Sequence, residues 1–246
     1  LSDVQLNALS TAKMASLETA DVAALSAATV SGLSTTQVQA LGSGQVTALE
    51  ANQVRALSAK QLNALDTADL AAMGTAQIVK LSAEQVGGLS TTQLQALTTT
   101  QVSALEGRQV KGLTTTQMAK LTTGQVQALT ADQFKQLTAT QLNALTTTQV
   151  AAIETADIAA LSASAAGALS TQFVNALTST QVQALDKTQL GGMTSQQIQA
   201  IETVDLTKMS TAQMAQLRAD QVGQLTTSQL NNLTSTQLQS LAGKQL

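Results

Sequence analysis

The chain has 246 residues, a net charge of −3, and no His, Cys, Trp, Tyr or Pro. Without His or Cys it lacks the usual general base, the thiol nucleophile, the nitrogen and sulfur metal ligands, and any disulfide. We therefore expect no enzyme activity and no cofactor. A nucleic-acid partner is also not expected, because the twelve basic residues are scattered and the only aromatic residues are Phe134 and Phe173.

No apolar run approaches the roughly 18 residues of a membrane-spanning helix, so membrane insertion is not expected. The chain starts at Leu1 in the full repeat pattern, without an initiator Met or a signal peptide. We interpret it as a processed product or as a section of a longer protein.

An eight-residue repeat runs from Leu1 to Leu246 without insertion or deletion. Position one is Leu in 26 of 31 octads, position two is Ser or Thr in 20, and position five is Gln in 23. Position six is apolar throughout. Such a period is typical of a solenoid, in which each unit buries its apolar face only against its neighbours. We predict one uninterrupted octapeptide-repeat solenoid over residues 1–246.

Each octad predicts one very short helix. A continuous helix fails, because eight residues advance it by about 800° and the apolar stripe drifts by about 80° per octad. Ser or Thr at position two with Gln at position five forms a capping box in each repeat. In one example Thr146 caps, Gln149 reaches back, and Val150 and Ile153 face inward. The predicted fold is an all-α solenoid of capped helices of six or seven residues.

A β-solenoid is the alternative fold. The Thr and Val content supports strands, but positions one and six would then point to opposite faces of one straight strand. A coil of strands would also need a turn in every octad, and Gly and Asn occur too sporadically to supply it.

Four octads carry an acidic residue at both position two and position five, and such paired carboxylates suit a calcium ion. The pairs are Glu18/Asp21, Asp66/Asp69, Glu154/Asp157 and Glu202/Asp205. A second interpretation is that these acids stabilise the first turn of a helix through its dipole. In that case Thr19, Thr67, Thr155 and Thr203 are the expected caps. No loop of closely spaced oxygen ligands accompanies any pair.

Other departures fall mainly at positions seven and eight. Lys80, Lys120 and Lys208 replace the small residue at position eight. We interpret them as solvated cations at helix C-termini, or alternatively as docking cations. Glycine pairs at 87–88 and 191–192 are expected to allow close packing.

Residues 163–173 are the least regular stretch. Ala166 leaves a gap in the apolar column, and Phe173 is expected to turn inward to fill it; a subunit contact is the alternative. Toward the C-terminus position eight becomes polar, which fits either a capping end or an interface with another molecule. These polar residues are Gln216, Gln224, Asn232 and Ser240.

Octads such as Leu145–Ala152 and Leu177–Ala184, which follow the pattern Leu-Thr-x-Thr-Gln-Val-x-Ala, resemble the repeat tracts of long secreted or cell-surface proteins of Gram-negative bacteria. Such proteins are described as adhesin-like, RTX-like or haem-utilisation proteins. The chain departs from the last two kinds, since it has no His, Tyr or Cys to bind iron and no glycine-aspartate nonapeptide. The resemblance implies an extracellular or cell-surface location.

We expect a structural role, in which the protein forms a rod or assembles head to tail with copies of itself. An open solenoid end matches the solenoid's own interior, and a head-to-tail contact propagates into a fibre. One alternative is an adhesin stalk or binding module that recognises a cell-surface or glycan partner, for which residues 163–173 are the candidate surface. Another is a passive spacer that stays monomeric.

Overall fold

The helices of this protein are set by the capping pattern of its octads. The computed structural model describes residues 3–241, and the described chain is all-helical, without strands. The predicted all-α solenoid with one short helix per octad is therefore confirmed, and the β-solenoid alternative is wrong. Leu1 and Leu246, which the repeat marks as terminal anchors, lie outside the described residues.

Helix α13 (Thr99–Ala104) shows how an octad folds. Thr98 is its N-cap, with extended backbone angles of φ −67° and ψ 158°, and its hydroxyl accepts a hydrogen bond from the Gln101 backbone N–H at 3.2 Å. The Gln101 side-chain oxygen accepts a bond from the Thr98 N–H at 2.8 Å, which completes the predicted capping box. The helix ends where Leu105 turns extended, at φ −57° and ψ 136°. The corner between two successive helices of this kind thus consists of two extended residues, at positions one and two of the octad.

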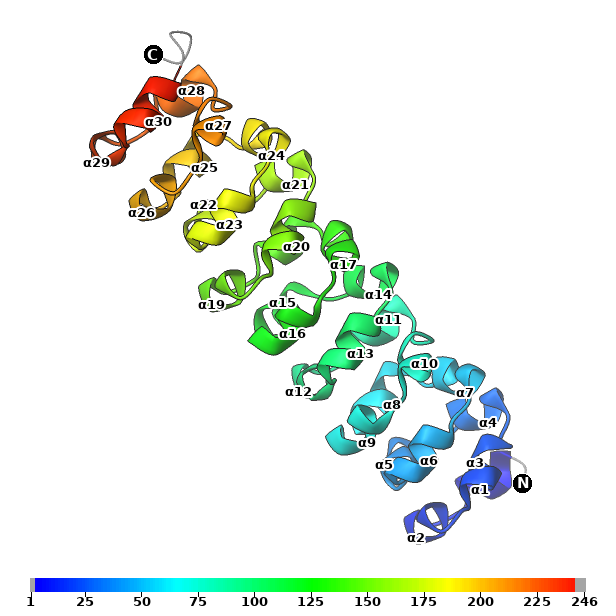
Figure 1. The fold of residues 1–246 in the computed structure, drawn as a ribbon. Helices are drawn as coiled ribbons and strands as arrows, with labels where there is room; N and C mark the ends of the chain where they lie inside the picture. The colour runs from blue at the N-terminus through cyan, green and yellow to red at the C-terminus, as the bar shows by residue number, and fades with distance from the viewer. Residues whose placement is uncertain (1–2, 242–246) are drawn as a thin grey trace. The chain divides into compact units, whose positions relative to one another are not determined.

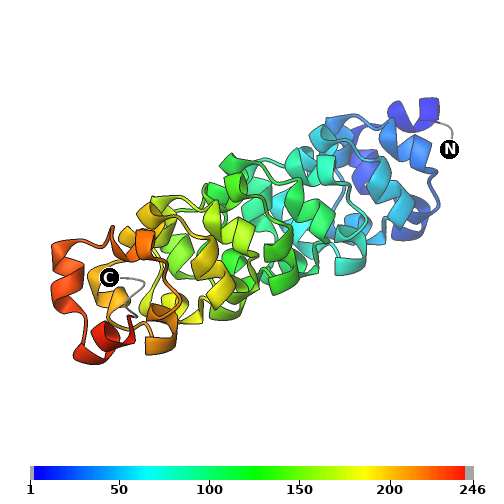
Figure 2. The same cartoon turned by 90° about the horizontal axis from the view of Figure 1, so that it is seen from above.

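The described helices run from four to six residues, so the predicted length of six or seven is met by the six-residue helices and is wrong for the shorter ones. Positions one and two of each octad form the extended corner, so at most six residues are left for the helix. The corners need no left-handed residue, since no described residue has a positive φ. The alternation of short helices and corners can be followed in Figures 1 and 2. None of the helices in residues 3–241 is long and apolar enough to cross a membrane.

The chain divides into two compact units, Leu1–Ala128 and Leu129–Leu246. The helices of the first unit are α1 (Asp3–Asn7), α2 (Thr11–Ala15), α3 (Thr19–Ala23), α4 (Ala27–Ser31), α5 (Thr35–Gln39), α6 (Ser43–Ala48), α7 (Ala51–Ala56), α8 (Ala59–Ala64), α9 (Thr67–Ala72), α10 (Thr75–Ile78), α11 (Ala83–Gly87), α12 (Thr91–Ala96), α13, α14 (Gly107–Lys111), α15 (Thr115–Lys120) and α16 (Thr123–Ala128). The prediction of one uninterrupted solenoid over residues 1–246 stays a prediction.

The second unit continues the same pattern. Its helices are α17 (Ala131–Gln136), α18 (Ala139–Leu142), α19 (Thr147–Ala151), α20 (Thr155–Ala160), α21 (Ala163–Gly167), α22 (Thr171–Asn175), α23 (Ser179–Ala184), α24 (Lys187–Gly192), α25 (Ser195–Gln199), α26 (Thr203–Leu206), α27 (Thr211–Met214), α28 (Ala219–Val222), α29 (Thr227–Asn232) and α30 (Ser235–Ser240).

Within each unit a helix packs against the helix three places further along, as α4 does with α7 and α21 with α24. Three octads, or 24 residues, therefore make one turn of the solenoid. The sequence left the number of octads per turn open. It is decided by the corners and by contacts between residues a full turn apart.

Positions one and six form the core, as predicted. Val150 is 0% exposed and Ile153 is 4% exposed, and the same pair recurs at Leu94 (0%) and Leu97 (3%). A helix of about six residues is unstable in isolation, so its stability comes from packing between turns. The buried apolar surface is consequently shared by every pair of successive turns within a unit.

Candidate functional site

The buried Gln at position five is the main polar element of the fold. The Gln101 side chain is 2% exposed, and its oxygen takes part in the capping box described above. Its Nε2 donates to the carbonyl oxygens of Leu70 at 3.0 Å and Met73 at 2.7 Å, both in the preceding turn. Acceptor and donors of the amide are therefore all engaged. Each such Gln joins a local helix cap to the preceding turn of the solenoid, which is called the turn below.

This second role explains why position five never carries Glu. Glu serves a capping box as well as Gln does, but its carboxylate has no N–H to donate to the turn below. The Ser/Thr-x-x-Gln pattern by itself predicts only the local cap. The preference for Gln over Glu was the available signal for the inter-turn bond, although the identity of the acceptors required the structure.

A second row of amides lies at position seven, on the outer surface. Asn63 donates to the Gly88 carbonyl at 2.8 Å and accepts from the Ser90 N–H at 2.7 Å in the following turn. Equivalent bonds to the following turn come from Gln95, Asn143, Asn175, Gln183 and Gln199. These bonds are exposed to water, so each contributes less than a buried one.

The four acidic pairs occupy the N-cap and third positions of α3, α9, α20 and α26. The caps are the acids Glu18, Asp66, Glu154 and Glu202, so the expectation that Thr19, Thr67, Thr155 and Thr203 cap these helices is wrong. Each of these threonines is the first residue of its helix, because the acid before it, at position two, still has extended backbone and forms part of the corner.

Within each unit the two acidic pairs lie on different turns. Asp21 and Asp69 are 48 residues apart, which is two turns, and so are Asp157 and Asp205. Residues 3–241 contain no group of three or more carboxylates placed to hold one metal ion. Calcium takes about six to eight oxygen ligands, more than one pair supplies. Calcium binding by any of these pairs stays a prediction for titration.

Two of the buried aspartates take their hydrogen bond from the turn below. Asp69 accepts from the hydroxyl of Ser43, and Asp205 accepts from the hydroxyl of Ser179, in each case 26 residues earlier. The residue 26 positions before Asp157 is Ala131, which has no hydroxyl. Asp157 Oδ2 is accordingly buried without a partner. Burial, with a smaller contribution from Glu154, raises the pKa of Asp157 to about 6.

Ser179→Ala should lower the free energy of unfolding at neutral pH by about 1–3 kcal/mol, because it leaves the buried Asp205 carboxylate without its donor. Urea unfolding at neutral pH measures the loss. Ser235→Ala, at the same octad position but exposed, is the matched control and should change stability little. Equal losses in the two variants would contradict the proposed bond.

Residues 163–173 place no aromatic ring on the surface. Phe173 is 3% exposed and Ala166 is 0% exposed, so the prediction that Phe173 turns inward is confirmed. Phe173 occupies position five, where Gln usually lies. The neighbouring octads carry Asp157 and Ala165 at the same position, so α20, α21 and α22 all lack this Gln.

Close packing at the glycine pairs is confirmed at three of the four positions and is wrong at Gly191. A Cβ on Gly192 would lie 2.6 Å from the Ala163 carbonyl oxygen, and one on Gly88 would lie 2.6 Å from Ala59 Cβ. A Cβ on Gly87 would collide with the Gly112 carbonyl. Gly191, by contrast, has nothing within 4 Å of an added Cβ. The backbones of successive turns therefore meet at selected position-seven and position-eight sites.

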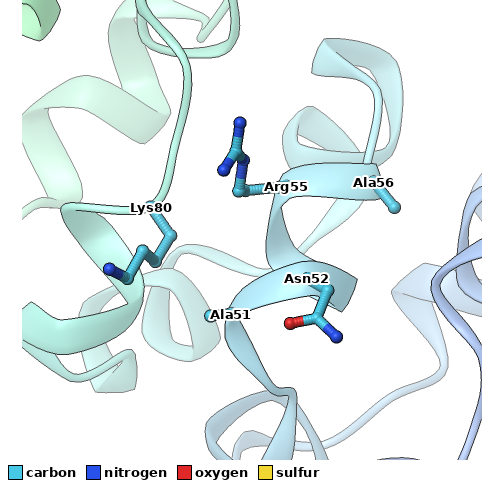
Figure 3. A pocket seen from close by; sticks show the side chains of 5 residues that line it. All are labelled: Ala51, Asn52, Arg55, Ala56 and Lys80. Carbon is cyan, nitrogen blue, oxygen red and sulfur yellow. The ribbon is translucent and has the colours of Figure 1, made fainter.

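The lysines at position eight are exposed at helix C-terminal ends, as predicted. Lys120 is the last residue of α15, and Lys80 and Lys208 follow just beyond α10 and α26. Lys80 also borders a shallow hollow of about 560 Å³ with Arg55, Ala51, Asn52 and Ala56. In Figure 3 the charged ends of Arg55 and Lys80 point in different directions. The two cations therefore do not converge on one ligand.

Among curated proteins, none matches this chain. The ALTTAQ repeat family matches residues 14–51, 63–99, 102–139, 118–152, 150–187 and 198–235. Its six-letter motif corresponds to positions eight and one to five of the octad, as in Ala96 to Gln101. That segment contains the helix end, the corner, the N-cap and the Gln that bonds to the turn below. These matches span most of the chain, which therefore belongs to the ALTTAQ repeat family.

Proposed function

We propose that this chain is a structural repeat protein whose copies associate head to tail into a rod. The observation that carries the proposal is that the first and the last turn of the described residues expose opposite halves of the same core. In interior turns both position one and position six are buried.

The N-terminal turn leaves position one uncovered. Leu9, Leu17 and Leu25 are half-buried, whereas Met14 and Val22 at position six are at most 1% exposed. Leu17 and Leu25 border a hollow of about 520 Å³. The hollow is also lined by Leu6, Asp21, Ala24, Ser26 and Thr29. A preceding turn would cover these leucines.

The C-terminal turn leaves position six uncovered. Leu230 is half-buried and Leu238 is 42% exposed, whereas Leu233 and Leu241 at position one are 7% and 5% exposed. A following turn would cover Leu230 and Leu238. The end turn of a second copy supplies the missing half of the core at each end, which is the geometry of a heterologous, propagating contact.

The contact between copies would be mainly apolar. Position five of the N-terminal turn carries Lys13, Asp21 and Thr29 in place of Gln. This turn therefore offers few amide donors to the carbonyls of another copy, and we expect association to be weaker than the contact between turns of one chain. Assembly should accordingly be reversible and depend on concentration.

Leu238→Glu should abolish assembly, because it places a charge where apolar surface is to be buried. Val204→Glu is the matched control, since Val204 is 56% exposed and lies on α26, outside the end turn. Sedimentation velocity at increasing micromolar concentration, with electron microscopy, measures the result. We expect growing rods for the unmodified chain and the control, and monomers for Leu238→Glu. A monomeric unmodified chain at every concentration would instead support the passive spacer.

The extracellular or cell-surface location is part of the same proposal and is supported by the resemblance of the octads. Fractionation of the source cells, with an antibody to the repeat, tests it. Detection in the cytoplasm alone would contradict it.

A further inference from the structure

One turn of the second unit lacks the amide bonds that join the other turns. Position five carries Asp157 in α20, Ala165 in α21 and Phe173 in α22, and these three helices make one complete turn. Elsewhere in residues 33–241 a turn loses at most one Gln, as at Asp69 and Asp205. The loss of the position-five Gln therefore covers one complete turn of the solenoid.

The missing amides leave carbonyls of the turn below without a side-chain donor. In the next turn along, Gln189 donates to Leu161 O at 2.7 Å and Gln197 donates to Leu169 O at 2.6 Å. In the described chain no side-chain amide reaches the equivalent carbonyls of Leu137 and Leu145. Asn143 bridges the same two turns on the outside, with bonds of 3.0 Å to Ala168 O and 2.7 Å from Ser170 N.

Asp157 adds a buried carboxylate to this contact. It is 4% exposed, and its Oδ2 has no partner because Ala131 replaces the serine found below Asp69 and Asp205. The neighbouring charged groups do little to stabilise the ionised form of Asp157. Glu154 on its own helix is acidic, and Asp132 and Lys135 on α17 pair with each other at 3.0 Å in solvent. Helix α23, on the other side, carries no titratable group.

The ionised form of Asp157 opposes packing of this turn. Its pKa in the folded chain is raised to about 6, from an ordinary value of 3.8. A group with a raised folded pKa stabilises the fold below its unfolded pKa, and that stabilisation is lost as pH rises through the folded pKa. Stability at this contact should therefore fall between about pH 4 and pH 6 and stay low above that range.

We infer that the contact between turn α17–α19 and turn α20–α22 is a weak plane built into the solenoid, which loosens at neutral pH and tightens on acidification. Two independent features produce it: the loss of all three position-five amides and the unpartnered Asp157 carboxylate. A rod containing such a plane opens or bends there before it does so elsewhere in the second unit.

Hydrogen exchange on the full chain, corrected for intrinsic rates, tests the inference at about pH 5 and about pH 7.5. Amides of α20–α22 should be less protected than those of α23–α25. Their opening equilibrium should change roughly tenfold between the two pH values, given folded and unfolded pKa values of about 6 and 3.8.

Two variants separate the pH response from general weakness. Ala131→Ser supplies the hydroxyl that Ser179 gives to Asp205, and should protect α20 at neutral pH and reduce the pH response. Asp157→Asn removes the titrating group and should abolish the response even if Ala131→Ser folds poorly. Equal protection of α20–α22 and α23–α25 at both pH values would overturn the weak plane. An unchanged pH response in Asp157→Asn would overturn its assignment to this residue.

Discussion

Replacing Gln101 with Leu should lower the free energy of unfolding of the first unit by about 3–5 kcal/mol, among the largest effects of any single polar substitution in the chain. The substitution keeps the approximate side-chain volume but removes the bonds to Thr98 N, Leu70 O and Met73 O. The bonds to the Leu70 and Met73 carbonyls are buried and the bond to Thr98 N is partly buried, and each buried group left unsatisfied costs about 1–3 kcal/mol. Urea unfolding followed by far-ultraviolet circular dichroism measures the loss.

Gln95→Leu is the control for this experiment. Gln95 lies on the adjacent helix α12 and makes one exposed bond, to Lys120 O at 2.6 Å. Its substitution should cost less than about 1 kcal/mol, because water replaces the lost partner. A further variant, Gln101→Glu, keeps the helix cap, loses the inter-turn donors and places a carboxylate oxygen against the Leu70 and Met73 carbonyls, so it should also be destabilised. If Gln101→Glu is as stable as the unmodified chain, the inter-turn bonds contribute nothing and the local cap is the whole role of Gln.

Gly192→Ala should lower the free energy of unfolding of the second unit by about 1–3 kcal/mol, because inserting a methyl group into a closely packed contact forces the backbones apart. The added Cβ would lie 2.6 Å from Ala163 O and 3.2 Å from Ala163 Cβ. The Ala163 carbonyl belongs to the backbone of α21 and cannot rotate away as a side chain would. The contact between α21 and α24 must therefore open to relieve the clash.

The adjacent Gly191 provides a control with the opposite sign. A Cβ there has nothing within 4 Å, and Gly191 lies inside helix α24. Gly191→Ala should therefore raise the free energy of unfolding by about 0.5–1 kcal/mol, since Ala restricts the unfolded chain and favours the helix. Thermal and urea unfolding of the two variants side by side distinguish them. Similar effects of both substitutions would mean that the turns do not meet at Gly192.

Several features of the fold follow from residues close together in sequence, and these could be predicted. The capping box of Thr146 and Gln149 joins residues three apart, and the pairing of Val150 with Ile153 depends on helical spacing alone. Both are confirmed. The inward turn of Phe173 was predictable too, because one large apolar residue followed the gap at Ala166 in an otherwise regular column.

The candidate calcium pairs show where such reasoning stops. The sequence identifies Asp69, Asp157 and Asp205 as equivalent, yet the residue 26 positions earlier distinguishes one of them. A serine lies there for Asp69 and Asp205, whereas Ala131 lies there for Asp157. That spacing of 26 residues has no meaning until the number of octads per turn is known. The different behaviour of Asp157 was therefore not predictable from its own octad.

The sequence by itself determined the unit of this protein: one short capped helix per octad, with positions one and six in the core. Hydrogen bonds and apolar contacts within a few residues suffice for that. The tertiary structure decided that three octads make a turn and that Gln Nε2 reaches carbonyls 28 and 31 residues earlier, as Gln101 reaches Met73 and Leu70. Every residue carries a backbone carbonyl, so such acceptors leave no mark in the sequence. Only the packing of one turn on another selects which carbonyls are bound.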